Sequence, residues 1–117
     1  MPQLYVNDVI VIDVVLDNAG ILKACKASGH SGAAKAGNDI VCAAVSVLLR
    51  TALSVLSGRQ GIKVKGGAPE RGELWLEADY TAEGKDFLFA AGEFLIDGLK
   101  SISQEFPKNC KLTINKT

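Results

Sequence analysis

The sequence has few of the residues that build metal sites or bind nucleic acid. It contains one histidine and three cysteines among 117 residues, and no two cysteines stand in C-x-x-C spacing. Because structural zinc sites take their Cys and His ligands in closely spaced pairs, and these cysteines are far apart, the sequence predicts no metal site and no cofactor. Thirteen basic residues balance thirteen acidic ones. This balance predicts no direct nucleic-acid partner, since such proteins carry a basic patch or stripe.

The sequence also has no long apolar run, and this absence bears on the expected cellular location of the protein. No run approaches the roughly 20 apolar residues of a membrane-spanning helix, and the N-terminal residues lack the basic-then-apolar order of a signal peptide. We therefore expect a cytoplasmic protein without a membrane partner, in which Cys25, Cys42 and Cys110 are free thiols. At this length and 48% hydrophobic residues, we expect one domain over residues 1–117.

The first half of the chain is predicted to form a hairpin followed by a helix. Residues 9–16 are rich in β-branched residues and apolar on both faces of a strand. Residues 17–20 signal a turn, and residues 21–28 are predicted to return as a second strand. Lys23 and Lys26 fall on opposite faces of that strand, so its core face stays unassigned. A helix is predicted over residues 39–57, and its apolar stripe has seven members: Val41, Val45, Leu48, Leu49, Ala52, Val55 and Leu56.

The second half is predicted to form another hairpin and another helix, followed by a last strand. Residues 62–65 and 73–80 alternate apolar and charged residues, and residues 84–105 form an amphipathic helix followed by a strand over residues 110–115. The stripe of this second helix is predicted to hold Phe87, Ala91, Phe94, Leu95 and Ile102. The order ββαββαβ predicts an α+β fold: a two-layer α/β sandwich in which two helices cover one face of a mixed sheet of about five strands. We expect the other face to form a homodimer through Val9, Val11 and Val15.

The only histidine lies close to a cysteine in a pattern that is typical of nucleophilic catalysis. His30 precedes a loop of small residues, 31–37, and the helix is expected to begin at Asn38 or Asp39, which places Cys42 in its first turn. The positive end of a helix dipole favours a thiolate there, and histidine supplies a proton acceptor and donor. Gly32 and Gly37 would let the loop close over a bound peptide as a lid.

Each of these residues also has a simpler interpretation. A lone cysteine is often a small packing residue, a lone histidine is often only hydrogen-bonded, and a glycine-containing loop is often only a connector. Asp39 either caps the helix or orients His30, and Ser46 hydrogen-bonds either near the thiolate or back to the helix backbone. Within one short stretch the chain combines its only histidine, a glycine-containing loop, an acidic cap and a cysteine at the start of a helix. This conjunction favours a catalytic pair.

The stretch over residues 29–48, GHSGAAKAGNDIVCAAVSVL, resembles the signature of the Prp family of ribosomal-processing cysteine proteases. That signature is Gly-His, a short small-residue loop, Gly-x-Asp, an apolar pair and Cys-Ala-Ala-x-Ser. The twelve positions from His30 to Cys42 fit it. Ser31 departs from it, since alanine is expected there.

The resemblance implies a homodimeric cysteine endopeptidase with Cys42 as nucleophile and His30 as general base and acid. Asp39 and Ser46 match two further positions of the signature. The implied substrate is the N-terminal extension of large-subunit ribosomal protein twenty-seven, whose removal is needed for ribosome maturation. Two other functions remain open from the residues: a non-catalytic ribosome-associated binding or assembly module, and a small-molecule thiol hydrolase with the same Cys/His pair.

Overall fold

The computed structural model describes residues 9–29, 36–68 and 73–117, and for residues 36–39 it describes the backbone alone. The predicted order of strands and helices is confirmed. The elements are β1 (Ile10–Leu16), β2 (Leu22–Ser28), α1 (Ala36–Leu56), β3 (Ile62–Gly67), β4 (Glu73–Tyr80), the 3₁₀ helix η2 (Ala82–Gly84), α2 (Lys85–Glu105) and β5 (Cys110–Lys116).

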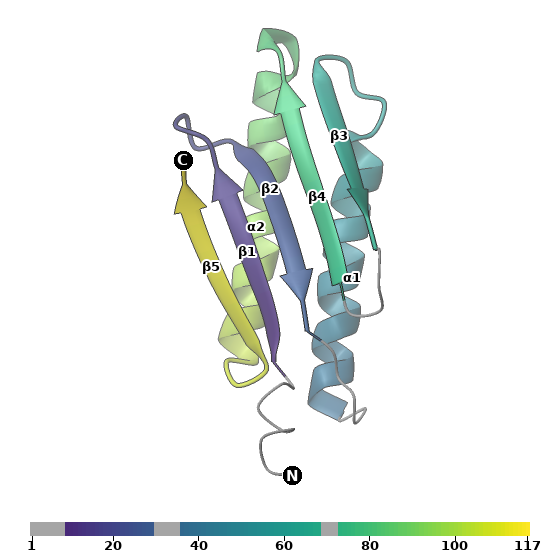
Figure 1. Cartoon of the computed structure of the whole chain (residues 1–117), viewed down its shortest axis with the longest axis vertical. Coiled ribbons are helices and arrows are strands. Elements are labelled where there is room, and N and C mark those ends of the chain that lie inside the picture. Colours follow the sequence, from purple (N-terminus) through teal and green to yellow (C-terminus); the bar gives the residue numbers. More distant parts are fainter. Residues whose placement is uncertain (1–8, 30–35, 69–72) are drawn as a thin grey trace.

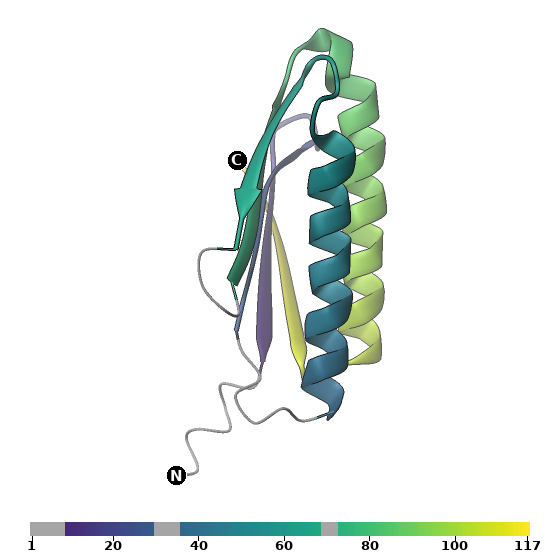
Figure 2. The ribbon, with the colours of Figure 1, turned by 90° about the vertical axis from the view of Figure 1, so that its right-hand side faces the viewer.

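The five strands form one mixed sheet in the order β3-β4-β2-β1-β5. All neighbouring strands are antiparallel except β1 and β5, which are parallel and pair Ile10 with Cys110. Both helices lie on one face of the sheet, as the two views in Figures 1 and 2 show, and no helix of the described ranges covers the other face. The predicted two-layer α+β sandwich is therefore confirmed. Neither helix in the described ranges is long and apolar enough to cross a membrane.

Helix α1 buries most of its predicted stripe against the sheet. Val41, Val45, Leu49 and Leu56 are at most 3% exposed, and Leu48 and Ala52 pack against the same core. The prediction for Val55 is wrong, because its side chain is 43% exposed. At about 100° per residue, Val55 lies roughly 85° from the centre of the buried stripe, beyond the reach of the sheet.

Helix α2 is rotated relative to the prediction. Its buried residues are Leu88, Gly92, Leu95 and Leu99, whereas Phe94 is 78% exposed, so its assignment to the core is wrong. The reason lies at Gly92, which adds nothing to a hydrophobic pattern but occupies the middle of the buried face. A Cβ at Gly92 would lie 3.0 Å from Cβ of Leu22, so the helix backbone packs closely on β2 there.

An irregular pairing in β2 explains why its core face was unassigned. Leu16 pairs with Leu22 while Val15 pairs with Ala24, which leaves Lys23 as an extra residue in the strand. The extra residue reverses the alternation beyond it. Lys23 and Lys26 are therefore both exposed. In a regular strand Leu22 and Ala24 would lie on the same face, but here Leu22 is buried in the core and Ala24 is only half-buried.

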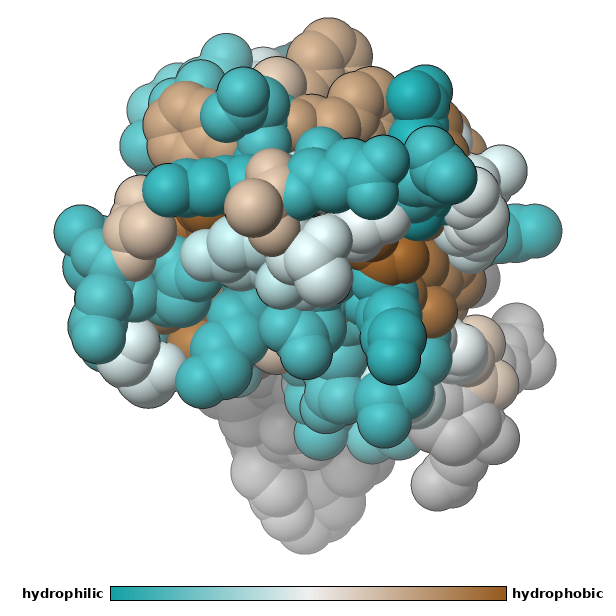
Figure 3. Space-filling view, turned by 90° about the horizontal axis from the view of Figure 1, so that it is seen from above, coloured by the Kyte–Doolittle hydropathy of each residue, from teal (hydrophilic) through white to brown (hydrophobic). Residues whose placement is uncertain are grey.

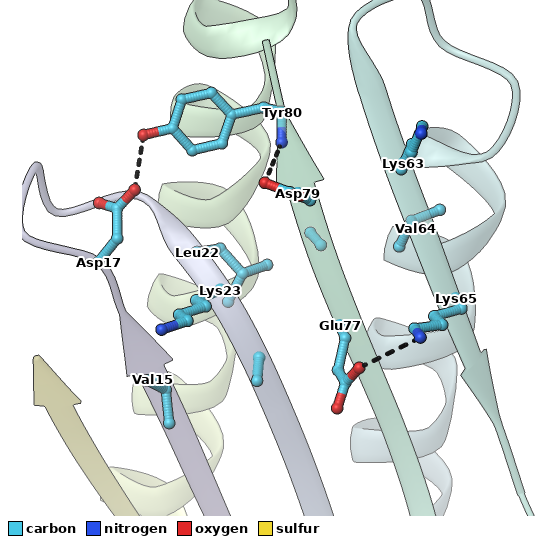
Figure 4. Close-up of a pocket in the computed structure, with 12 residues that line it drawn as sticks. Val15, Asp17, Leu22, Lys23, Lys63, Val64, Lys65, Glu77, Asp79 and Tyr80 are labelled. Atoms are coloured by element: carbon cyan, nitrogen blue, oxygen red, sulfur yellow. Dashed lines mark hydrogen bonds and ion pairs between the residues drawn. The ribbon is translucent and has the colours of Figure 1, made fainter. Parts of the chain in front are cut away.

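The uncovered face of β3 and β4 carries lysines opposite carboxylates, as predicted. Lys63 pairs in register with Asp79 and Lys65 with Glu77, and Lys65 Nζ lies 3.9 Å from Glu77 Oε1. Figure 4 shows these side chains on neighbouring strands.

Figure 3 views the molecule from above, where hydrophilic residues form most of the visible surface and hydrophobic ones show between them. This end of the molecule is thus mainly polar.

Candidate active site

Helix α1 begins earlier than predicted, and this moves Cys42 away from the helix terminus. The helix starts at Ala36, so Asn38 and Asp39 lie inside its first turn and neither is the N-cap. Ala36 and Gly37, which were assigned to the loop, instead form the first two residues of the helix. Alanine has the highest helix propensity, and the glycine costs about 1 kcal/mol relative to alanine. The backbone N–H groups without a partner within α1 are those of residues 36–39. Cys42 lies in the second turn, which corrects its predicted position.

The same shift changes the predicted lid and the predicted cap. Gly37 lies within α1, so the loop expected to run as far as Gly37 ends before Ala36. Asp39 is the fourth residue of the helix, and its side chain lies outside the described residues, so a role in orienting His30 remains a prediction. His30 and Gly32 also lie outside the described residues.

Cys42 lies on the flank of α1, beside the buried stripe of the helix. Its side chain is half-buried and packs against the core, between the fully buried Val41 and the exposed Ala43. Ser46 is also half-buried and follows one turn later on the same side of the helix. A thiol in this position combines support from the core with access from solvent, which a nucleophile requires.

The other two thiols are enclosed in the sheet. Cys25 and Cys110 are 1% and 2% exposed. Burial, with a smaller contribution from the charge of Asp13, raises the pKa of the Cys25 thiol to about 12, and burial raises the pKa of Cys110. Neither forms a thiolate readily at neutral pH, so both serve as packing residues of the sheet. Within the described part of the chain, no group of three or more His, Cys, Asp or Glu is placed to hold a metal ion.

A pocket of about 360 Å³ lies beside the flank of α1 that carries Cys42. Its lining comes from α1, from the end of β3 and from the start of β4: Ser46, Leu49, Arg50, Leu53, Gly67, Ala68, Leu74 and Trp75. The sequence analysis missed this pocket. A signal was present, because Cys42, Ser46, Leu49 and Leu53 follow one another at spacings of four, three and four residues along one side of the helix.

A second hollow lies on the uncovered face of the sheet, away from the helices. It measures about 740 Å³ and is drawn in Figure 4. Several of its charged groups already have partners: Lys65 pairs with Glu77, Lys23 Nζ donates to Thr117 Oγ1 at 3.3 Å, and Asp17 accepts from Tyr80. This arrangement is suited to holding the strands together, so the Cys42 side of α1 is the better candidate site.

The fold matches solved structures along nearly its whole length. The structure of SMU.848 from Streptococcus mutans has a TM-score of 0.78 and 22% identity, with 93% of this chain and 96% of that chain covered. The ribosomal processing protease Prp from S. aureus, solved with a substrate peptide, has a TM-score of 0.75 and 19% identity, with 90% and 98% covered. At these identities the likeness establishes the fold alone.

The sequence comparisons identify a family but no individual curated relative. A comparison with curated proteins found no match. The model of the family described as cysteine protease Prp matches residues 9–111, from the residue before β1 into β5, and this span includes Cys42. The chain belongs to the Prp family of cysteine proteases.

Proposed function

We propose that this protein is a cysteine endopeptidase that removes the N-terminal extension of large-subunit ribosomal protein twenty-seven during ribosome maturation. The observation that carries the proposal is the position of Cys42, the one half-buried thiol beside two buried ones, next to a pocket on the same flank of α1. Family membership supports cysteine protease chemistry. The S. aureus relative is named an essential ribosomal processing protease, which favours a ribosomal substrate.

In the proposed reaction, His30 and Cys42 act as a pair. The imidazole of His30 takes the proton from Cys42 Sγ, and the sulfur attacks the scissile carbonyl carbon. The C–N bond breaks as His30 returns the proton to the leaving amine, which leaves an acyl-enzyme. Water then attacks the thioester, with His30 as base, and releases the extension as a carboxylate while Cys42 recovers its proton. Ser46, one turn beyond the thiol, and Asp39 are proposed as supporting residues.

The test is to incubate the purified protein with the ribosomal protein precursor and follow the mass of both products. We expect one cleavage that releases the N-terminal extension, and we expect His30→Ala to lower its rate by at least about 10²-fold because the proton acceptor is lost. A precursor that stays intact over hours, under conditions in which a synthetic peptide of its extension is also uncut, would contradict the proposal.

A homodimer and a cytoplasmic location are part of the same proposal. The dimer is proposed to use the uncovered sheet face, where Val11 is 39% exposed and Val9 and Val15 are half-buried. Light scattering at micromolar concentration tests it. Val11→Asp is expected to give a monomer, and Val47→Asp, at an exposed valine of α1 on the helix side of the molecule, is the matched control. A wild-type protein that is monomeric in this measurement would contradict the dimer.

A further inference from the structure

The outward face of α2 carries a phenylalanine that the core does not use. Phe94 is 78% exposed, more than any other large apolar residue of the described ranges. Its neighbours on the same side of the helix are Ala90, four residues earlier, and Ser101, seven residues later, and both are exposed. A single exposed apolar residue is common on a protein surface. The residues around Phe94 therefore decide whether this face has a role.

A second exposed apolar residue lies close to Phe94, on α1. Val47 is 60% exposed, and it directly precedes Leu48. Leu48 contacts α2, because a Cβ at Gly98, one turn after Phe94, would lie 2.9 Å from Leu48 Cδ1. Val47 and Phe94 thus both lie within about one turn of the place where the two helices meet. A hollow of about 760 Å³ borders this surface, and its lining includes Ala90, Glu93, Phe94, Asp97 and Ser101.

The charges around Phe94 are acidic. Asp86, Glu93 and Asp97 are exposed, and their spacings of seven and four residues place them in one line along α2. In the described part of the chain the one ion pair lies between β3 and β4, so none of these three carboxylates is paired. Lys100, the one basic residue in the described lining of the hollow, lies about 120° around the helix from Phe94. An exposed aromatic ring thus stands beside unpaired negative charge.

We propose that this face of α2 is a docking surface for a basic part of the substrate protein, outside the segment that is cleaved. The inference rests on the proposed function, because it takes the substrate to be a ribosomal protein. A protein that binds RNA carries clustered Lys and Arg. Such a cluster is complementary to Asp86, Glu93 and Asp97, and an apolar residue within it would cover Phe94. The proposed homodimer uses the uncovered face of the sheet, opposite the helices, so both surfaces can be occupied together (Figure 2).

Docking on α2 would strengthen binding and leave the chemical step unchanged. The docking surface belongs to α2, whereas Cys42 belongs to α1, so its contacts are the same before and during the reaction. Such contacts lower KM and leave kcat as it is. One aromatic side chain and three solvent-exposed carboxylates make a small interface, for which we expect a Kd on the order of 10 μM. The cleaved product can then leave.

The first test compares the intact precursor with a synthetic peptide that holds only the extension and the cleavage site. Phe94→Ser is expected to raise KM for the precursor about tenfold and to leave kcat and the cleavage of the peptide unchanged. Phe89→Ser is the matched control, because it removes another exposed phenylalanine of α2, about 140° away around the helix. We expect it to behave like wild type with both substrates. Thermal denaturation verifies that both variants fold.

The second test changes the charge. Asp97→Lys is expected to raise KM for the precursor several-fold, since it places a like charge beside the basic surface. With wild type, KM for the precursor is expected to rise with added salt, and this rise is expected to be smaller in the variant. Asp79→Lys makes the same change of charge at an exposed position on the uncovered face of the sheet, and it is the control.

A binding measurement tests the docking surface without any cleavage. The mature ribosomal protein, which lacks the extension, is titrated into wild type, Phe94→Ser and Phe89→Ser by calorimetry. We expect it to bind wild type and Phe89→Ser equally, and Phe94→Ser about tenfold more weakly.

The outcomes separate this inference from the proposed function. If the precursor is cleaved while Phe94→Ser and Asp97→Lys keep the KM of wild type, the docking surface is wrong and the protease assignment stands. If the mature protein binds and Phe94→Ser weakens that binding, yet the precursor is not cleaved, the docking surface stands and the protease assignment fails. A Phe94→Ser variant that changes the oligomeric state in light scattering would mean that a second copy covers this face, and the proposal would be overturned.

Discussion

The hydroxyl of Tyr80 donates a 2.6 Å hydrogen bond to Oδ2 of Asp17, which joins the end of β4 to the turn between β1 and β2 (Figure 4). The other carboxylate oxygen, Oδ1, accepts from the backbone N–H groups of Ala19 and Ile21 at 2.9 and 3.0 Å. The bond from Tyr80 is the largest cause that lowers the pKa of Asp17, and the same bond raises the pKa of Tyr80. One carboxylate therefore closes its own turn and holds a strand two positions away in the sheet.

These two shifts predict how stability depends on pH. The lowered pKa of Asp17 means that its contribution is present above its ordinary value, about 4, and is lost as pH falls through the folded pKa. The raised pKa of Tyr80 means that its contribution is present below its ordinary value, about 10, and is lost as pH rises through the folded pKa. Tyr80→Phe is thus expected to lower Tm at neutral pH, and the difference from wild type is expected to shrink in acid below about pH 4. Circular dichroism melts across pH measure this. A difference that is constant from neutral pH into strong acid would contradict it.

The close packing of α2 on β2 predicts a difference between two glycines. A Cβ at Gly92 would lie 3.0 Å from Cβ of Leu22, which is fixed to the strand, whereas one at Gly98 would lie 2.9 Å from Leu48 Cδ1, at the movable end of a side chain. Overpacking costs about 1–3 kcal/mol, and glycine to alanine in a helix returns up to about 1 kcal/mol. We expect Gly92→Ala to be less stable than Gly98→Ala by about 1 kcal/mol in urea unfolding. Equal stabilities would mean that β2 moves freely away from α2.

The burial of the three cysteines predicts their reactivity. A thiol reagent at neutral pH is expected to modify one cysteine per chain rapidly in the folded protein and three in denaturant, and peptide mapping is expected to locate the rapid site at Cys42. Cys25, whose pKa is raised to about 12, is expected to react only after unfolding. A folded protein in which Cys42 reacts as slowly as Cys25 would instead favour the non-catalytic binding module.

The sequence predicted the elements of this fold well, because each strand and helix carries its own periodic pattern. The prediction failed where a single residue interrupts the periodic pattern because of strand pairing or helix packing in the folded protein. The extra residue Lys23 reverses the alternation of β2, and Gly92 hides the centre of the buried face of α2 from any hydrophobic count. Phe94 was consequently placed in the core, although it is 78% exposed.

For the site, the local motif was enough to place Cys42 near the start of α1 and to suggest the family. It was not enough to find the start of the helix, because the small residues before Asn38 are compatible with either a loop or a helix. The pocket beside Cys42 joins α1 to residues such as Trp75, which lies more than 20 positions after Leu53 in the chain. The packing of α1 against β3 and β4 brings them together, and no local pattern encodes that packing.

The central claim is that Cys42 is the nucleophile of a peptide bond cleavage, and one comparison tests it most directly. Wild type, Cys42→Ala and Cys110→Ala are incubated with the ribosomal protein precursor, and the released extension is quantified by mass. We predict that wild type and Cys110→Ala release it, whereas Cys42→Ala keeps the circular dichroism spectrum of wild type but loses activity by several orders of magnitude, on the order of 10⁶-fold. Release of the extension by Cys42→Ala at a rate near that of wild type would contradict the account.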